Sequence, residues 1–166
     1  MQSPVVNEIA WALQKAGIAS LRFDWRGIGA SGGTPSGREE DADDDYAAAL
    51  DHLEETVNGE IVACGYSFGA AAALRAAADR PRVMRLVLVS PPPQLIDPAA
   101  LARFVGRVLI VTGALDTIAP PEALGALAAR ARRGHFAVIP ECDHFFGVGL
   151  AELGREVSGW LAGGPR

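Results

Sequence analysis

The pentapeptide Gly65-Tyr66-Ser67-Phe68-Gly69 constrains the fold of this chain more than any other stretch. It lies between a strand-like run, residues 60–64, and an alanine-rich segment, residues 70–78, that favours a helix. A strand that turns directly into a helix exposes the serine, and we expect both flanking glycines to approach neighbouring backbone. The helix N-terminus directs N–H groups and a positive dipole end at the same point. Because the chain contains 19 glycines, the pattern also arises by chance, and Ser67 would then be an ordinary N-cap.

Composition narrows the class of protein. The chain has 166 residues and 17.3 kDa, which predicts one domain spanning residues 1–166. A net charge of −5 argues against nucleic acid as a partner. No apolar run approaches the roughly 18 residues that span a bilayer, so we expect no membrane association. The N-terminus lacks a signal-peptide pattern, which predicts a cytoplasmic protein, and Cys64 and Cys142 do not form a metal-ligand spacing. We expect no metal and no other cofactor.

Short apolar runs alternate with amphipathic segments along the whole chain, which is typical of an α/β fold. The runs are continuous rather than alternating, as expected for strands covered on both faces. The sequence therefore predicts a three-layer α/β/α architecture with a mainly parallel sheet. The expected strands are Ile18–Phe23, Ile61–Cys64, Leu86–Val89, Val108–Thr112 and Phe136–Ile139.

The expected helices have readable starts. Ser3-Pro4 begins the first, and Ser36-Gly37-Arg38-Glu39 resembles a capping box that opens the second. The second helix would bury Tyr46, Leu50, Leu53 and Val57. Asp97-Pro98 and Pro121 begin two more, the latter running to about residue 132, and the last helix carries Leu150, Leu153, Val157 and Leu161. The acidic residues between 39 and 45 are interpreted as first-turn and solvent-facing carboxylates rather than as metal ligands.

A serine nucleophile needs a base, and the base needs an acid that orients it. Of the three histidines, His52 is expected mid-helix and His135 on the surface, whereas His144 follows the last predicted strand. Loops at the carboxyl ends of parallel strands build sites in such sheets, so His144 is the candidate base. Asp116, after the preceding strand, is the candidate acid. Asp143 is the alternative, although it sits beside the histidine and more plausibly braces the loop.

Ser67, Asp116 and His144, in this order, resemble the α/β-hydrolase superfamily. The run Asp24-Trp25-Arg26-Gly27-Ile28-Gly29-Ala30-Ser31 is similar to a turn that follows a strand in that superfamily. More narrowly, the chain resembles small bacterial hydrolases without a lid, often described as esterases. The resemblance implies that the three residues form a catalytic triad and that the Phe68 N–H belongs to the oxyanion hole.

The chain departs from this family at its amino end. Family members have three further strands there, and a loop after the third donates a second oxyanion N–H; the resemblance implies that this chain lacks both. The missing strand would lie between Ile18–Phe23 and Ile61–Cys64. Because unpaired backbone groups are costly, we expect these two strands to pair directly, giving five parallel strands in sequential order. The alternative is a strand from another chain, as in a homodimer.

Two functions follow from these observations. The first is a serine hydrolase acting on carboxylic esters or similar small acyl substrates, with Tyr66, Pro91, Pro92 and Leu95 lining the substrate site. Only about 17 residues separate the strand ending near Ser90 from the next, which leaves no room for a lid domain. The second is a non-catalytic member of the superfamily that serves as an interaction or structural module.

Overall fold

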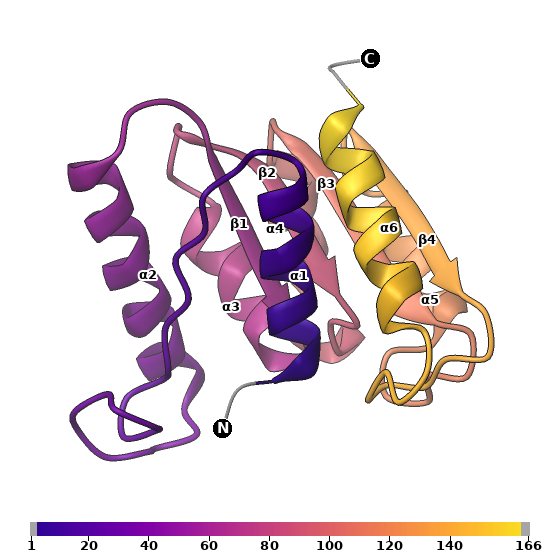
Figure 1. The fold of residues 1–166 in the computed structure, drawn as a ribbon, viewed down its shortest axis with the longest axis horizontal. Helices are drawn as coiled ribbons and strands as arrows, with labels where there is room; N and C mark the ends of the chain where they lie inside the picture. The colour runs from indigo at the N-terminus through magenta and orange to yellow at the C-terminus, as the bar shows by residue number, and fades with distance from the viewer. Residues whose placement is uncertain (1–2, 164–166) are drawn as a thin grey trace.

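The fold is a parallel sheet between two layers of helices, seen in a computed structural model that describes residues 3–163. Four strands pair in sequential order: β1 (Ile61–Tyr66), β2 (Val83–Val89), β3 (Arg107–Gly113) and β4 (Gly134–Ile139). Helices connect them in the order shown in Figure 1. The α/β/α architecture predicted from the sequence is confirmed.

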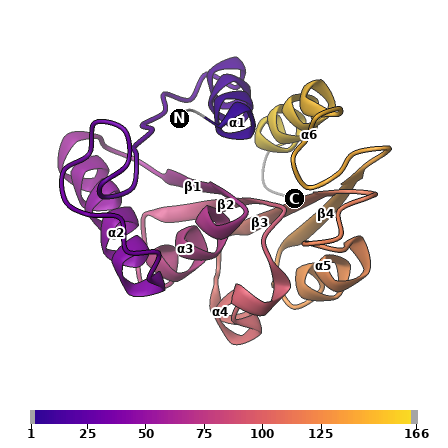
Figure 2. The same ribbon diagram turned by 90° about the horizontal axis from the view of Figure 1, so that it is seen from below.

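The helices divide between the two faces of the sheet (Figure 2). One face carries α1 (Pro4–Lys15) and α6 (Leu150–Ala162), which pack against each other. The other carries α2 (Glu39–Thr56), α3 (Phe68–Ala77), the 3-10 turn η1 (Pro93–Leu95), α4 (Pro98–Arg103) and α5 (Pro121–Ala128). Helix α5 ends short of the predicted residue 132. No helix within residues 3–163 is long and apolar enough to cross a membrane.

The two central strands are buried on both faces, which explains why they are apolar throughout. Leu86 and Leu88 of β2 belong to the hydrophobic cluster under α3 and α4. Their neighbours Val87 and Val89 belong to the opposite cluster, with α1 and α6. Each buried side chain of this size contributes about 1.5–3 kcal/mol to folding. The two layers therefore hold the carboxyl ends of the strands at one well-defined edge.

The predicted strand Ile18–Phe23 is wrong as a sheet member. The segment is extended, but β1 is the edge strand of the sheet and pairs only with β2 among the described strands. Its two ends are held elsewhere: the Ile18 N–H donates to the Leu13 carbonyl at 2.9 Å, and Phe23 packs on Tyr46 with ring centroids 5.5 Å apart. The segment therefore stays away from β1, and a cleft of about 710 Å³ separates the two.

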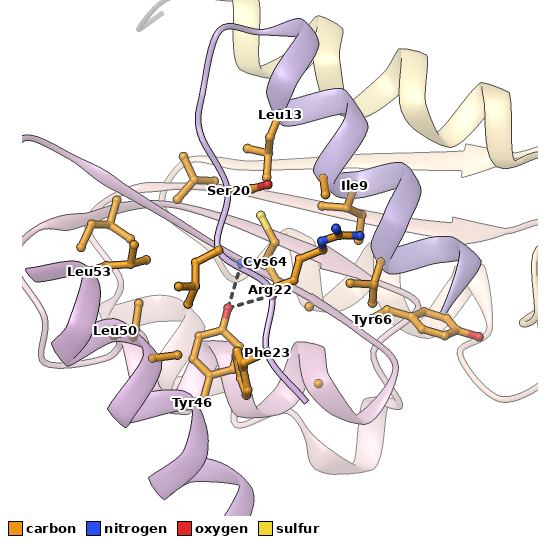
Figure 3. Close-up of a pocket in the computed structure, with 18 of the residues that line it drawn as sticks. Ile9, Leu13, Ser20, Arg22, Phe23, Tyr46, Leu50, Leu53, Cys64 and Tyr66 are labelled. Atoms are coloured by element: carbon orange, nitrogen blue, oxygen red, sulfur yellow. Dashed lines mark hydrogen bonds between the residues drawn. The ribbon is translucent and has the colours of Figure 1, made fainter. Parts of the chain in front are cut away.

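Tyr46 of α2 partly satisfies the open edge of β1. Its hydroxyl donates to the Cys64 carbonyl at 2.7 Å and accepts from the Cys64 N–H at 2.9 Å (Figure 3). Burial raises the pKa of this phenol above its ordinary value. A side chain thus occupies the place where the peptide group of a neighbouring strand would bind.

Helix α2 differs from the prediction at both ends. It begins at Glu39 with Arg38 as N-cap, because Gly37 has a φ of +66° and interrupts the expected capping box. The Ser36 hydroxyl instead contacts Asp41 and the Arg38 N–H. At the other end, Val57 caps the helix and is exposed rather than part of its core face.

Four of the six acidic residues between 39 and 45 bond two arginines, whereas Glu40 and Asp44 are exposed, as expected. Arg26 bonds Asp41 and Asp45, each at 2.8 Å, and fixes the turn of residues 24–31 against the helix. Arg75 of α3 bonds Asp43 and Glu39, each at 2.8 Å. Within the described residues, no group of three or more metal-ligating side chains is present.

We expect Arg75→Met to lower the free energy of unfolding by about 1–2 kcal/mol, measured by urea denaturation. The variant keeps the apolar stem of the side chain but removes the bonds that fasten α2 to α3. Arg103→Ala is the control, because that side chain is exposed and its nearest carboxylate, Asp97, lies 3.7 Å away. The control should change stability by less than about 0.5 kcal/mol. Equal effects of the two substitutions would contradict this role for Arg75.

Candidate active site

Ser67 occupies a strained turn between β1 and α3. Its φ of 52° and ψ of −125° are unfavourable for a residue with a side chain. The turn is possible because α3 lies very close to β1: a Cβ on Gly65 would come within 2.2 Å of the Gly69 carbonyl oxygen. The serine side chain therefore projects at the carboxyl edge of the sheet, where α3 begins.

The two glycines of the motif are not equivalent, contrary to the expectation from the sequence. A Cβ on Gly69 would meet only the Trp25 ring, at 3.5 Å, which is an ordinary contact. The difference arises because Gly65 faces the backbone of α3, whereas Gly69 faces a side chain. Only the glycine that precedes the serine is therefore required by close packing.

The structure brings Ser67, His144 and Asp116 together in one line of hydrogen bonds. Ser67 Oγ lies 2.9 Å from His144 Nε2. His144 Nδ1 lies 2.9 Å from Asp116 Oδ2 and 3.1 Å from Oδ1. Each side chain comes from the carboxyl end of a different strand: β1, β4 and β3. The arrangement allows a proton to move from the serine to the imidazole while the carboxylate orients the ring.

Asp116 is held as a carboxylate by its surroundings. Its Oδ1 accepts from the N–H groups of Ile118 at 2.9 Å and Ala119 at 2.7 Å. Burial acts to raise the pKa of Asp116, but the bonds from Ala119, Ser90 and His144 outweigh it, and the pKa lies below its ordinary value. A buried acceptor for the His144 N–H is therefore present at neutral pH.

The loop after β4 is shaped around His144. The Tyr66 hydroxyl donates to the His144 carbonyl at 2.8 Å, which ties this loop to the end of β1. Asp143 accepts from the Phe145 N–H at 3.0 Å, so it braces the loop, and Asp116 takes the position beside the imidazole. Glu141 and Phe146 both have positive φ. Backbone strain often marks functional sites, and here it occurs on each side of the histidine.

Two residues that support the site, Ser90 and Thr112, were not among the site residues predicted from the sequence. Ser90 has a φ of 44° directly after β2, and Thr112 of β3 lies 3.3 Å from Asp116 Oδ2 through its hydroxyl oxygen. Thr112 also donates to the Ala119 carbonyl at 2.8 Å, which shapes the loop that carries the acid. Both are fully buried. A polar residue at the end of an otherwise apolar strand is the signal that identifies them.

The remaining site predictions divide into two groups. Tyr66 lines the cleft that reaches Ser67. Pro91 and Pro92 are buried, and Leu95 packs against the cluster under α3; none of the three lines that cleft. Their part in substrate binding stays a prediction. The other histidines lie away from the hydrogen-bonded line: both are exposed, and His135 faces Glu156 at 3.3 Å.

Comparison with known protein families yields one matching description. The model of the family described as serine aminopeptidase, S33, matches residues 2–106. Among curated proteins, the chain is 38% identical over 96 residues to the thiohydrolase apmlB of Arthrinium phaeospermum, covering 55% of this chain and 31% of that protein. It is 32% identical over 164 residues to an uncharacterised protein of Mycobacterium tuberculosis, covering 82% and 57%. The chain thus spans 31% of the length of the first relative and 57% of the second.

Solved structures extend the likeness to the whole chain. A serine hydrolase homologue from Coxiella burnetii aligns with a TM-score of 0.89 and 31% identity, covering 98% of this chain and 78% of that one. A serine hydrolase without a lid from Xanthomonas campestris aligns with a TM-score of 0.82 and 27% identity, covering 99% and 77%. The resemblance to the lidless hydrolases inferred from the sequence motifs agrees with these alignments.

We expect Gly65→Ala to destabilise the protein by about 1–3 kcal/mol or more, because the added methyl overlaps the Gly69 carbonyl and forces α3 away from β1. Gly69→Ala is the matched control. It adds the same methyl in ordinary contact with Trp25 and improves helix propensity by up to about 1 kcal/mol. Urea denaturation of both variants tests the asymmetry, and equal destabilisation would refute it.

The lowered pKa of Asp116 predicts a pH-dependent contribution to stability. A carboxyl group with a depressed folded-state pKa stabilises the fold above its unfolded pKa, about 3.9, and loses this effect as the pH falls through the folded-state value. The stability difference between wild type and Asp116→Asn should therefore be largest near neutral pH and shrink below about pH 4. A difference that is the same at pH 3 and pH 7, measured by thermal unfolding, would contradict this assignment.

Proposed function

Because this chain belongs to the serine aminopeptidase S33 family, within the α/β-hydrolase superfamily, we propose that it is a serine hydrolase of small acyl esters or thioesters. One observation carries the proposal. Ser67, in a strained turn at the start of α3, lies 2.9 Å from the imidazole of His144, whose other nitrogen lies 2.9 Å from the carboxylate of Asp116. An N-cap serine with no catalytic task would need neither the strain nor the buried partners.

In the proposed reaction, Ser67 Oγ attacks the acyl carbonyl carbon and His144 Nε2 takes the hydroxyl proton. The tetrahedral intermediate collapses to an acyl-serine, and His144 returns the proton to the departing alcohol or thiol. Water then attacks the acyl-serine while His144 takes its proton, and His144 returns that proton to Ser67 Oγ as the acid departs. Asp116 keeps the Nδ1 proton in place and stabilises the charged imidazole throughout.

The developing oxyanion needs hydrogen-bond donors. The Phe68 N–H, at the first position of α3, is one, and the positive end of the helix dipole supports it. The family resemblance assigns the second donor to a loop that precedes α1. Loss of one of two donors lowers turnover by about 10²–10³ in enzymes of this kind.

Two observations bear on the substrate: exposed apolar side chains near the site favour an apolar acyl group, and the position of the segment between β2 and β3 leaves the site accessible. Exposed apolar side chains lie on the two loops that carry Asp116 and His144, namely Leu115, Ile118, Phe145 and Val148. The segment between β2 and β3 packs under the sheet through Ile96, Leu101 and Phe104 and leaves the carboxyl edge uncovered (Figure 2). The thiohydrolase relative from Arthrinium phaeospermum makes thioesters a substrate class to test beside oxygen esters.

A fluorophosphonate probe, which reacts with activated serines, tests the proposal directly. We expect one label on the wild-type chain, no label on Ser67→Ala, and nitrophenyl-ester turnover lowered about 10⁴-fold in Asp116→Asn. Cys142→Ala is the control: burial raises the pKa of its thiol to about 11, so it is not a nucleophile at neutral pH, and the variant should keep its activity. Absence of labelling in folded wild-type protein would favour the non-catalytic interaction module.

A further inference from the structure

The loop that carries His144 is held at the histidine itself by one side chain. Two residues earlier, the Cys142 carbonyl accepts from the Leu115 N–H at 2.8 Å, which fastens the start of the loop to the segment after β3. Among residues 3–163, the backbone of His144 has a single hydrogen bond, in which the Tyr66 hydroxyl donates to its carbonyl at 2.8 Å. Tyr66 therefore holds the peptide group from which the imidazole side chain extends.

The ring of Tyr66 contacts the same loop. Its centroid lies 5.6 Å from that of the imidazole, with the two planes tilted by 34°. It also lies 6.2 Å from the centroid of the Phe146 ring, in an edge-to-face arrangement. Phe146 is buried, so it offers a fixed surface behind the tyrosine. One side chain thus supports His144 at its carbonyl and at its ring.

Tyr66 is also the residue that directly precedes the nucleophile. Tyr66 and Ser67 hold His144 at opposite ends, because Tyr66 bonds its carbonyl and Ser67 Oγ lies 2.9 Å from its Nε2. The histidine is 78 and 77 positions away from them in the chain, so these contacts set the distance between β1 and the loop after β4. A misplacement of about 1 Å between reacting groups can lower a rate by about 10²-fold.

The Tyr66 hydroxyl remains a hydrogen-bond donor at neutral pH. Burial raises the pKa of this phenol above its ordinary value, and the negative charges of Asp116 and Asp143 raise it further. The proton that bonds the His144 carbonyl is therefore present under the conditions in which the imidazole would act as a base.

We propose that Tyr66 is a positioning residue of this site, which holds the loop so that the imidazole of His144 stays in line between Ser67 and Asp116. The proposal rests on the proposed function and adds to it a residue that takes no part in the proton transfer. The alternative is the substrate-binding role expected from the sequence. Although Tyr66 lines the cleft, its side chain extends away from Tyr46 on the opposite side (Figure 3).

Steady-state kinetics of Tyr66→Phe separate the two roles, because this variant loses the hydroxyl and keeps the ring. We expect kcat to fall about tenfold for both nitrophenyl acetate and nitrophenyl butyrate, with KM changed by less than about twofold. Tyr46→Phe is the matched control, since it removes the same atom from the chain's other tyrosine, which bonds Cys64 of the same strand. The control should lower the urea midpoint more than Tyr66→Phe does and should keep kcat.

Nuclear magnetic resonance tests the positioning without catalysis. The Nδ1 proton of His144 is buried against Asp116, whereas His52 and His135 are exposed, so their ring protons exchange rapidly with water. In Tyr66→Phe, we expect the His144 ring proton to exchange about tenfold faster than in wild type, because the loop opens more often. In Tyr46→Phe, at a pH and temperature where the protein stays folded, its exchange should match that of wild type.

Three results would overturn the proposal. The first is a kcat of Tyr66→Phe equal to that of wild type, and the second is a raised KM with an unchanged kcat, which would assign the hydroxyl to substrate binding. The third is equal exchange of the His144 ring proton in the two proteins. If the fluorophosphonate probe leaves the wild-type chain unlabelled, the proposed function fails, and the ring-proton exchange still decides whether Tyr66 holds the imidazole in place.

Discussion

The close approach of α3 to β1 is the constraint on which the rest of this structure depends. The carbonyl oxygen of Gly69 lies 2.2 Å from where a Cβ of residue 65 would be, and without that Cβ the chain can turn from strand to helix within one residue. That reversal places Ser67 at a positive φ and aims the first N–H groups of α3 at the same point. Alanines 70–73 of α3, which are fully buried, keep the helix near the sheet. Strain at the serine is offset by packing behind it.

The carboxyl edge of the sheet collects the strain of the fold. All four described non-glycine residues with positive φ, namely Ser67, Ser90, Glu141 and Phe146, follow β1, β2 or β4 at this edge. The loops they shape hold the imidazole between a hydroxyl and a buried carboxylate without any rearrangement. Such preorganisation is what a proton relay requires, because the groups need not move when charge develops.

The outer edge of β1 differs from the two central strands in how its backbone is paired. The strands β2 and β3 each have a strand on both sides, whereas the outer edge of β1 faces a cleft, and one tyrosine hydroxyl bonds that edge at Cys64. Apolar side chains of α1 and α2 line this cleft, as helices cover β2 and β3. The wall opposite β1 is the segment of residues 18–23, and residues 19–23 make no backbone hydrogen bond among the described residues. The cleft along the edge of β1 reaches Ser67, so it adjoins the hydrogen-bonded line of Ser67, His144 and Asp116.

The sequence by itself determined the α/β class, four of the five expected strands, and the hydroxyl, imidazole and carboxylate that the structure brings together. These follow from local signals: apolar runs, turn residues and the position of polar residues just after strands. Only the tertiary structure decided that Ile18–Phe23 stays out of the sheet, that Gly65 and Gly69 differ, and that Ser90 and Thr112 stand behind Asp116. Strand pairing and close contact depend on groups far apart in the chain, and a strand pattern states only that a segment can pair. Whether it does pair depends on what holds its ends, here the Leu13 carbonyl and the Tyr46 ring.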